Sequence, residues 1–312
     1  MVAARDQEAI IRIARMRYEE KRSQQEIARH LGVSTSTVSR SLRQAMALGF
    51  VEIRVVPQST RRNDYERLLQ ERFGLETVIV VASGNEESAT LETLGRAVAD
   101  YLMTLLRPDA VIGVSDGRTT AAVARHVRRT DLSGIEVVPL IGGVGGAKLP
   151  THPYEVALTL AHGLGVANRP LPVPAAVDSE ETAAALLASP IVRTAFEVIA
   201  RCDVALVGVG TISKDAAIVR HGVVSAEDME TARTQLKAAG TVCARFYDSK
   251  GASIPSWIDS RMLTVTIEQL KAVPWRLGVA IGASKVSAMK AALDGGLFNV
   301  LGTDEQTAAA LL

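Results

Sequence analysis

The stretch Ser23–Arg43, SQQEIARHLGVSTSTVSRSLR, decides how the first part of the chain folds. Ser23 is followed three residues later by Glu26, which is the pattern of a capping box and begins a helix. Gly32 tolerates the left-handed conformation that ends this helix, and Ser34 caps the next one. Two helices joined by such a short glycine-containing turn are predicted to cross at a steep angle.

Small and aliphatic residues at fixed spacing support this helix pair. Ala28 lets the two backbones approach, while Val38 and Leu42 face the first helix from the second. This is the arrangement of a helix-turn-helix, whose second helix enters the major groove of DNA. Its outward residues are short hydroxyls and basic side chains, which suit phosphates and base edges. The residues expected to contact operator DNA are Ser23, Gln24, Ser34, Thr35, Ser36, Thr37, Ser39, Arg40 and Arg43. The alternative is an ordinary capped helix pair with a solvated polar face.

The charge of the chain is divided unevenly along its 312 residues, although the net charge is only +1. Residues 1–62 hold 12 Lys and Arg against 6 Asp and Glu, and the remainder holds 23 against 28. A small basic region ahead of a larger acidic one predicts nucleic-acid binding confined to the N-terminal part. We therefore expect a DNA-binding domain at 1–57, ending in an exposed strand at 50–56, then a linker at 58–63 and an effector and oligomerisation domain at 64–312. Because so small a DNA-binding domain covers only one half of a symmetric operator, we expect a homodimer or homotetramer.

From residue 64 onward, aliphatic segments such as TVIVVA (77–82), AVIGVS (110–115) and VALVGV (204–209) alternate with amphipathic ones. Near-continuous aliphatic strands are typical of a mostly parallel sheet covered on both faces, so this domain is predicted to be a doubly wound α/β domain. The other expected strands are 135–141, 242–247, 262–267, 277–281 and 298–301. The expected helices are 64–73, 87–106, 117–128, 154–164, 180–201, 226–239, 284–293 and 305–311.

Several classes of protein are disfavoured by features that the sequence lacks. It has no run of about 18 uncharged apolar residues and no signal-peptide order at its start, so we expect a cytoplasmic protein without a membrane partner. Cys202 and Cys243 fit neither a disulfide framework nor a zinc site. No Walker motif, metal-ligand cluster or Ser-His-Asp signature occurs, and we expect no metal and no cofactor.

Glycines, hydroxyls and basic residues follow several predicted strands, where ligands of open α/β sheets bind. The segment 113–120, GVSDGRTT, leaves free backbone N–H groups at a helix start, which favours an anion. Further strand ends carry Gly142-Gly143, Gly208-Val209-Gly210-Thr211 and Gly282-Ala283-Ser284-Lys285. A lysine at a helix N-terminus is unfavourable unless an anion is bound there. The alternative for each segment is a strand-to-helix turn that needs glycine and a cap.

The motifs taken together resemble the SorC family of bacterial transcription regulators nearly from end to end. They are SQQEIARHLGVSTSTVSRSL, GVSDGRTT, PLIGG, VGVGTIS, RFYDSKG, VAIGASKVSAMKAAL and NVLGTDEQTAAALL. The resemblance implies an effector domain similar to sugar-phosphate isomerases of the glucosamine-6-phosphate deaminase type, with a phosphorylated sugar that controls DNA binding. Two segments depart from the family pattern: Gly240-Thr241-Val242 stands where Gly-Asp-Ile is usual, and Ile281-Gly282-Ala283 stands where Ala-Gly-Gly usually precedes the lysine.

The same resemblance implies the residues of the effector site. By motif, the phosphate loop corresponds to Ser115, Gly117, Arg118 and Thr119. The pocket floor corresponds to Gly142, Gly143, Gly208, Gly210 and Thr211. Phe246 and Asp248 are implied to line the pocket, and Lys285 to make a second contact with the anion.

We therefore expect a sequence-specific transcriptional regulator, a repressor of sugar catabolism whose operator affinity is controlled by a sugar phosphate. One alternative is a phosphosugar isomerase or deaminase-like enzyme with an accessory DNA-binding domain. It needs a general base near the reacting carbons, for which Asp116 and then Asp248 are the nearest candidates, neither of them convincing. We expect no catalytic residues. Another alternative is a regulator that senses an unphosphorylated sugar or polyol. A nucleotide-binding domain is disfavoured because the glycine-rich segments lack the acidic partner that such loops have.

Overall fold

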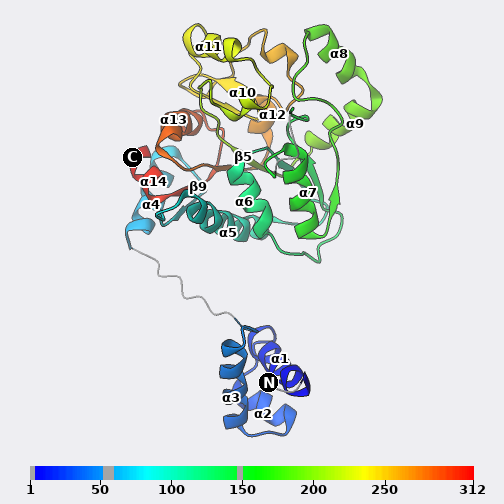
Figure 1. The fold of residues 1–312 in the computed structure, drawn as a ribbon, viewed down its shortest axis with the longest axis vertical. Helices are drawn as coiled ribbons and strands as arrows, with labels where there is room; N and C mark the ends of the chain where they lie inside the picture. The colour runs from blue at the N-terminus through cyan, green and yellow to red at the C-terminus, as the bar shows by residue number, and fades with distance from the viewer. Residues whose placement is uncertain (1–3, 52–59, 146–149) are drawn as a thin grey trace. The chain divides into compact units, whose positions relative to one another are not determined.

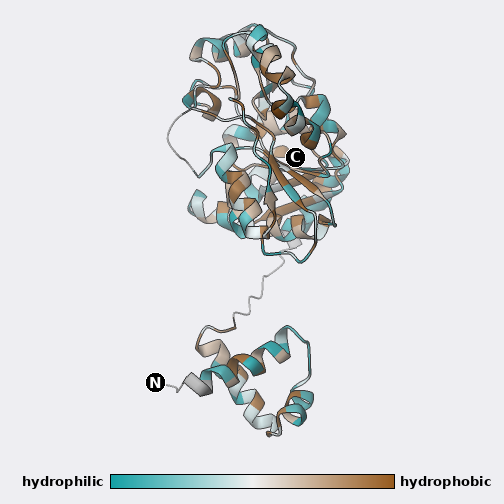
Figure 2. Cartoon of the chain, turned by 90° about the vertical axis from the view of Figure 1, so that its right-hand side faces the viewer, coloured by the Kyte–Doolittle hydropathy of each residue, from teal (hydrophilic) through white to brown (hydrophobic). Residues whose placement is uncertain are grey.

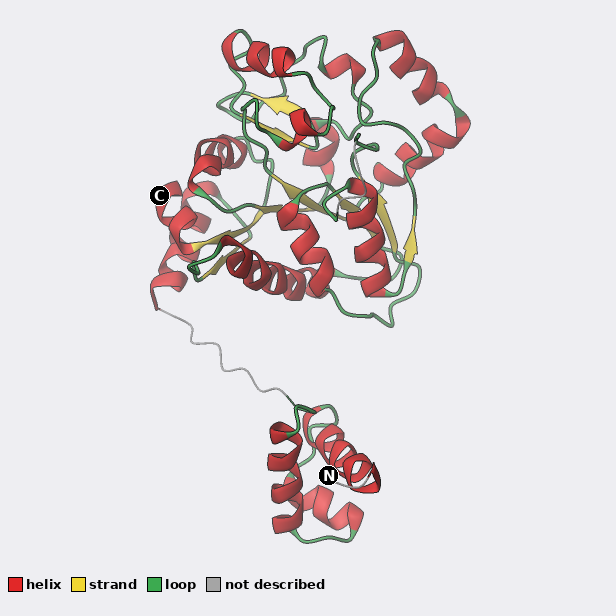
Figure 3. Cartoon of the chain, in the orientation of Figure 1, coloured by secondary structure: helices red, strands yellow, loops and turns green. Residues whose placement is uncertain are grey.

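The computed structural model describes residues 4–51, 60–145 and 150–312. The chain forms two compact units, Met1–Gln58 and Ser59–Leu312, which are described separately. Figures 1 and 3 show that the first unit is helical and that the second contains the strands.

The first unit packs three helices, α1 (Ala4–Tyr18), α2 (Gln24–Leu31) and α3 (Thr35–Ala47). The capping box that begins α2 is present, since the Ser23 N–H donates to Glu26 Oε2 at 2.7 Å and the Glu26 N–H donates to Ser23 Oγ at 3.2 Å. Gly32 ends α2 with a φ of 67°. Ile27 and Val38 are fully buried between the helices, so the core is the one that the spacing predicts. The strand predicted at 50–56 lies almost wholly outside the described residues.

The second unit is built on a sheet of seven strands in the order β1-β9-β8-β5-β2-β3-β4, and every neighbouring pair in it is parallel. This confirms the predicted α/β fold. The strands are β1 (Thr77–Val81), β2 (Val111–Val114), β3 (Glu136–Pro139), β4 (Ala167–Asn168), β5 (Val204–Gly208), β8 (Trp275–Val279) and β9 (Val300–Asp304).

Helices cover both faces of this sheet, because alternate strand residues point to opposite sides. In β5, Val204 and Leu206 join one hydrophobic cluster, while Ala205 and Val207 join the other. The first cluster is covered by α5 (Glu87–Leu105), α6 (Arg118–His126) and α7 (Pro153–Leu164), which lie together on one side of the sheet in Figure 1. The second is covered by α4 (Thr60–Phe73), α9 (Pro190–Ile199), α12 (Ile267–Ala272), α13 (Val286–Asp294) and α14 (Glu305–Leu311). Figure 2 shows the apolar strands between these layers.

A smaller lobe completes the unit beside the sheet. It contains the antiparallel hairpin β6 (Gly240–Val242) and β7 (Arg245–Tyr247), with α10 (Ala217–Arg220) and α11 (Ala226–Thr234). The single strand predicted at 242–247 is therefore wrong. Cys243 and Ala244 form the turn with left-handed φ values of 48° and 61°. The sequence does not predict this turn, because glycine or asparagine normally occupies such positions.

Other boundaries also differ from the prediction. The strand predicted at 262–267 is wrong, because Met262 and Thr264 make only isolated bridges and α12 begins at Ile267. The helix predicted at 180–201 is broken at Pro190 into α8 (Glu180–Ala188) and α9, which are bent by 85°. Within the described residues no single helix is long and apolar enough to cross a membrane, and only this bent pair reaches the required length.

Helix α4 begins at Thr60, so residues 60–63 are helical although they were expected in the linker. The helix is tied to the sheet and to the last helix of the unit. Glu66 Oε1 accepts from the Val80 N–H at 2.9 Å, and Arg62 lies 3.8 Å from the Glu305 carboxylate of α14. Helix α14 is tied in turn to the loop after β8, because the Gly282 N–H donates to Thr307 Oγ1 at 2.8 Å.

Candidate nucleic-acid interface and ligand cavity

Helix α3 presents one buried and one polar face. Val38, Leu42 and Ala45 are buried against the rest of the first unit. Ser36, Arg40 and Arg43 follow one another at helical spacing on the exposed side, so that they form a single stripe. Of the other residues predicted to contact DNA, Ser23, Ser34, Thr35 and Thr37 are exposed, and Gln24 and Ser39 are half-buried.

The start of α3 is a cluster of hydroxyl groups. Ser34 Oγ accepts from the Thr37 N–H at 3.1 Å and lies 2.7 Å from Ser36 Oγ and 2.8 Å from Thr37 Oγ1. The helix N-terminus and these exposed hydroxyls form a surface suited to a phosphate, and the arginines one and two turns further along suit base edges.

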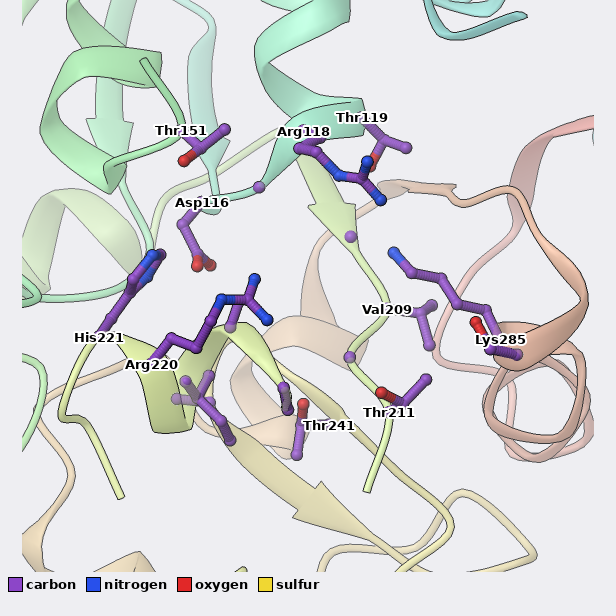
Figure 4. Close-up of a pocket in the computed structure, with 18 of the residues that line it drawn as sticks. Asp116, Arg118, Thr119, Thr151, Val209, Thr211, Arg220, His221, Thr241 and Lys285 are labelled. Atoms are coloured by element: carbon purple, nitrogen blue, oxygen red, sulfur yellow. The ribbon is translucent and has the colours of Figure 1, made fainter. Parts of the chain in front are cut away.

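A cavity of about 450 Å³ opens in the second unit where β2, β5 and β8 end (Figure 4). The sheet order reverses between β2 and β5, because the chain proceeds from β2 towards β3 but from β5 towards β8. Such a point is where open α/β sheets bind ligands. Polar side chains line the cavity from several elements: Glu87, Asp116, Arg118, Thr119, Thr151, Thr211, Asp215, Arg220, His221, Thr241, Ser284 and Lys285.

One wall of the cavity is the N-terminus of α6. Gly117 precedes this helix with a φ of 122°, a conformation that L side chains rarely adopt, and its N–H donates to the Thr151 carbonyl at 3.1 Å. Arg118 begins the helix and points its guanidinium into the cavity (Figure 4), 2.7 Å from the Glu87 carboxylate. Helix dipole and guanidinium together favour an anion at this wall.

Lys285 extends into the cavity across from Asp116 (Figure 4). It ends a short 3-10 helix, Ala283–Lys285, that follows Gly282 with its φ of 104°. Burial lowers the pKa of the half-buried Lys285 ammonium, Arg118 adds to this effect, and Glu87 and Asp116 oppose it. An anion placed between Lys285 and α6 would stabilise the ammonium form and so offset this effect on the pKa.

Asp116 directs its carboxylate into the cavity beside His221 (Figure 4). Its backbone carbonyl accepts from Ser115 Oγ at 3.1 Å, which fixes the turn after β2. Burial raises the pKa of Asp116, while His221, Lys285 and His152 act in the opposite direction. The carboxylate is therefore held in a desolvated position that a polar ligand would stabilise.

Some of the residues implied by the resemblance line the cavity and others do not. Gly117, Arg118, Thr119, Gly208, Gly210, Thr211 and Lys285 line it. Ser115 lies behind its wall, where its hydroxyl accepts from the Gly208 N–H at 3.1 Å and joins β2 to β5. Thr119 lines the cavity, but its hydroxyl donates to the Val279 carbonyl of β8 at 2.9 Å. Both hydroxyl groups are thus hydrogen-bonded to backbone groups of the sheet.

Four of these residues lie elsewhere. Gly142 and Gly143 bond to the Leu263 and Val173 carbonyls, and a Cβ on Gly142 would meet the Pro174 carbonyl at 2.4 Å, so close packing requires the glycine. Phe246 is buried in the hydrophobic cluster of the smaller lobe. Asp248 caps a turn, and hydrogen bonds from the Ala252 and Lys250 N–H groups lower its pKa.

Sequence reasoning missed several lining residues. Arg220 and His221 belong to or follow α10, which is too short to leave a periodic pattern. Thr241 did leave a signal, because it lies in Gly240-Thr241-Val242, one of the two segments that depart from the family pattern. Over the described ranges no group of three His, Cys, Asp or Glu side chains is placed to hold a metal ion.

Comparison with known proteins identifies both units. A family model described as "Putative sugar-binding domain" matches residues 58–312, and one described as "Sigma-70, region 4" matches residues 10–47. The chain is 32% identical to the deoxyribonucleoside regulator of Bacillus subtilis over 98% of this chain and 97% of that one. It is 29% identical to the sorbitol operon regulator of Klebsiella pneumoniae, with 97% of each chain covered.

The fold comparison agrees with the sequence comparison. The crystal structure of the full-length sorbitol operon regulator SorC from Klebsiella pneumoniae superposes with a TM-score of 0.85 at 29% identity, covering 98% of both chains. These relatives are named as regulators and not as enzymes, and the arrangement of a helical DNA-binding unit ahead of an α/β unit is shared along the whole length. The chain belongs to the SorC family of bacterial transcriptional regulators.

Proposed function

We propose that this regulator is a repressor of genes for sugar use and that a phosphorylated sugar in the cavity controls its affinity for operator DNA. A phosphorylated effector is supported by one observation: Arg118, Lys285 and the N-terminus of α6 come together at one side of the cavity. The names of the relatives support a sugar-related effector, since one is named a sorbitol operon regulator and another a deoxyribonucleoside regulator.

Control of DNA binding requires that the effector bind the DNA-bound and DNA-free arrangements with unequal affinity. A tenfold change in operator affinity corresponds to about 1.4 kcal/mol of this difference. One charge-assisted hydrogen bond gained or lost by Arg118 or Lys285 is sufficient. The effector therefore needs only a modest rearrangement at this wall to act as an inducer.

We further propose that the regulator acts in the cytoplasm as a homodimer or homotetramer on DNA. One α3 helix reads one half-site, so specific binding by a symmetric regulator requires at least two copies. Sedimentation at micromolar protein, with and without operator, is expected to show a dimer or a larger species. A monomer under both conditions would contradict this assembly.

The experiment uses operator fragments obtained by selection from random DNA, with binding followed by fluorescence anisotropy. Pentose and hexose phosphates are compared with their unphosphorylated parents at equal concentration. We expect a sugar phosphate to lower operator affinity at least tenfold while its parent has no effect. An equal response to the neutral sugar or polyol would show that the phosphate is not required, and Arg118→Ser would then leave the response intact.

A further inference from the structure

The cavity contains two polar groups that the chain itself does not satisfy. The Asp116 carboxylate lies in the cavity wall, where it is hydrogen-bonded to its own backbone N–H and lacks a hydrogen-bond or ion-pair partner on any other described residue. The Nδ1 atom of His221 is buried and likewise lacks a hydrogen-bond partner in the described part of the chain. Buried polar groups in native proteins are nearly always hydrogen-bonded, because leaving one unsatisfied is costly.

These groups lie beside one another and are held rigidly. Figure 4 shows the His221 ring next to the Asp116 carboxylate, with Arg118 and Lys285 further along the cavity. Ser115 Oγ donates to the Asp116 carbonyl at 3.1 Å. The backbone N–H of His221 donates to the Ala217 carbonyl at 2.9 Å, and the backbone carbonyl of His221 accepts from the Gly145 N–H at 3.0 Å. Fixed backbones on both sides mean that little ordering is left for a ligand to impose.

We propose that Asp116 and His221 are a specificity-determining pair that reads hydroxyl groups of the effector, beside the subsite for its phosphate. The proposal rests on the proposed function and adds to it how the sugar hydroxyl groups of the effector are recognised. A carboxylate only accepts hydrogen bonds, whereas a neutral imidazole has one donor and one acceptor nitrogen. A hydroxyl group donates and accepts, so one hydroxyl or two neighbouring ones satisfy both side chains together.

The charges around the pair disfavour a charged ligand group beside Asp116. A second phosphate at Asp116 would meet a carboxylate, and like charges in a desolvated site repel. An ammonium group at Asp116 would meet Lys285 and Arg220, which line the same cavity. Groups of both signs therefore face this end of the cavity, which favours a neutral, hydroxyl-bearing surface on the part of the effector that lies against Asp116 and His221.

The test measures two affinities on the full chain by calorimetry. The probes are inorganic phosphate, the neutral sugars ribose and glucose, and four sugar monophosphates: ribose 5-phosphate, glucose 6-phosphate and the 2-deoxy form of each. In Asp116→Asn we expect the affinity for the sugar phosphate that binds best to fall at least tenfold. We expect the affinity for inorganic phosphate to stay equal or to rise, because a nearby negative charge is removed. Damage to the fold would weaken binding of both probes, so a loss for the sugar phosphate without a loss for inorganic phosphate identifies hydroxyl reading.

His221 is tested by two replacements. His221→Phe keeps a ring without polar atoms and is expected to lose at least fivefold in affinity for the sugar phosphate, whereas His221→Asn restores a polar group and is expected to recover part of the loss. Asp131→Asn, an exposed acid outside the cavity, is the matched control and should change neither affinity.

The outcomes distinguish this inference from the proposed function. Unchanged sugar-phosphate affinity in Asp116→Asn, or equal loss for both probes, overturns the hydroxyl pair and leaves the proposed function standing. If the wild-type chain binds unphosphorylated ribose or glucose instead, and Asp116→Asn abolishes that binding, the proposal of a phosphorylated effector is wrong. The proposal that Asp116 and His221 read hydroxyl groups is then supported. A wild-type chain that binds no probe overturns both.

Discussion

The Arg118 guanidinium lies 2.7 Å from the Glu87 carboxylate at the wall of the cavity, so the cation that faces the proposed phosphate already has an anionic partner. Both side chains are more than half exposed, at 66% and 57%. Exposed pairs of this kind contribute only about 0–1 kcal/mol. A phosphate therefore displaces Glu87 at little cost, although the two anions compete for the same donor.

Removing this competitor is expected to strengthen binding of the anion. In Glu87→Gln, we expect affinity for inorganic phosphate and for the effector to rise about two- to fivefold, the range that about 0.4–1 kcal/mol allows. Glu92→Gln is the control, because Glu92 pairs with Arg125 and His126 and does not line the cavity. Isothermal titration that shows weaker binding in Glu87→Gln would mean that Glu87 positions Arg118 rather than competing for it.

The Thr119 hydroxyl is expected to stabilise the second unit. Thr119→Val leaves the Val279 carbonyl without its side-chain donor in a buried position, at a cost of about 1–3 kcal/mol, whereas Thr119→Ser retains the donor. Both tryptophans of the chain, Trp257 and Trp275, belong to the second unit, so fluorescence during urea unfolding reports on that unit alone. Equal midpoints for Thr119→Val and wild type would contradict a structural role.

The lowered pKa of Lys285 predicts how effector binding varies with pH. A bound phosphate favours the ammonium, so binding takes up a proton where the pH exceeds the lowered pKa that the free protein gives Lys285. Affinity should therefore fall as the pH rises through that value. Lys285→Met should bind the phosphate more weakly and lose this alkaline decline. It should keep the decline at low pH that comes from the second ionisation of phosphate near pH 6. Identical alkaline profiles for the two proteins would exclude Lys285 as the anion contact.

The lowered pKa of Lys285 has the opposite effect on the stability of the fold, whose cost is relieved rather than increased at high pH. The unfolded chain binds the Lys285 proton more tightly than the folded chain, so the lysine costs stability at neutral pH. That cost disappears only as the pH rises from the lowered pKa towards the ordinary value of about 10.4. We expect Lys285→Met to have a higher midpoint of thermal unfolding at neutral pH. A lower midpoint would show that the ammonium is stabilised by contacts in the free protein.

Arg40→Ala is expected to weaken specific operator binding without altering effector binding. Arg40 lies in the exposed stripe of α3 one turn after the hydroxyl cluster, and loss of a base contact costs about 1–3 kcal/mol. Arg12→Ala removes the same charge from an exposed position on α1 and serves as the control. Anisotropy titrations on operator and on unrelated DNA separate the two roles. An equal loss on both would assign Arg40 to the phosphate backbone.

The parts of the fold that could be predicted from the sequence are those set by local patterns. The capping box at Ser23 and the aliphatic strand at 204–209 each carry their signal within a few residues. The turn at Cys243 and Ala244 carries none, because its left-handed residues are not glycines: Cys243 packs into the hydrophobic cluster on the sheet and Ala244 into that of the smaller lobe. The cavity was only partly predictable for a related reason. A motif marks a strand end, but it does not tell which side chains face the ligand and which, like Ser115, close the sheet behind it.

The two contacts of α14 have a consequence for how an occupied cavity is communicated. Gly282, which precedes the Lys285 loop, is bonded to Thr307, and Glu305 of the same helix pairs with Arg62 at the start of α4. Helix α4 is the first element of the α/β unit after its boundary with the DNA-binding unit. The two-turn helix α14 is therefore bonded both to the loop that carries Lys285 and to the first helix of the α/β unit, a connection that includes no strand of the sheet.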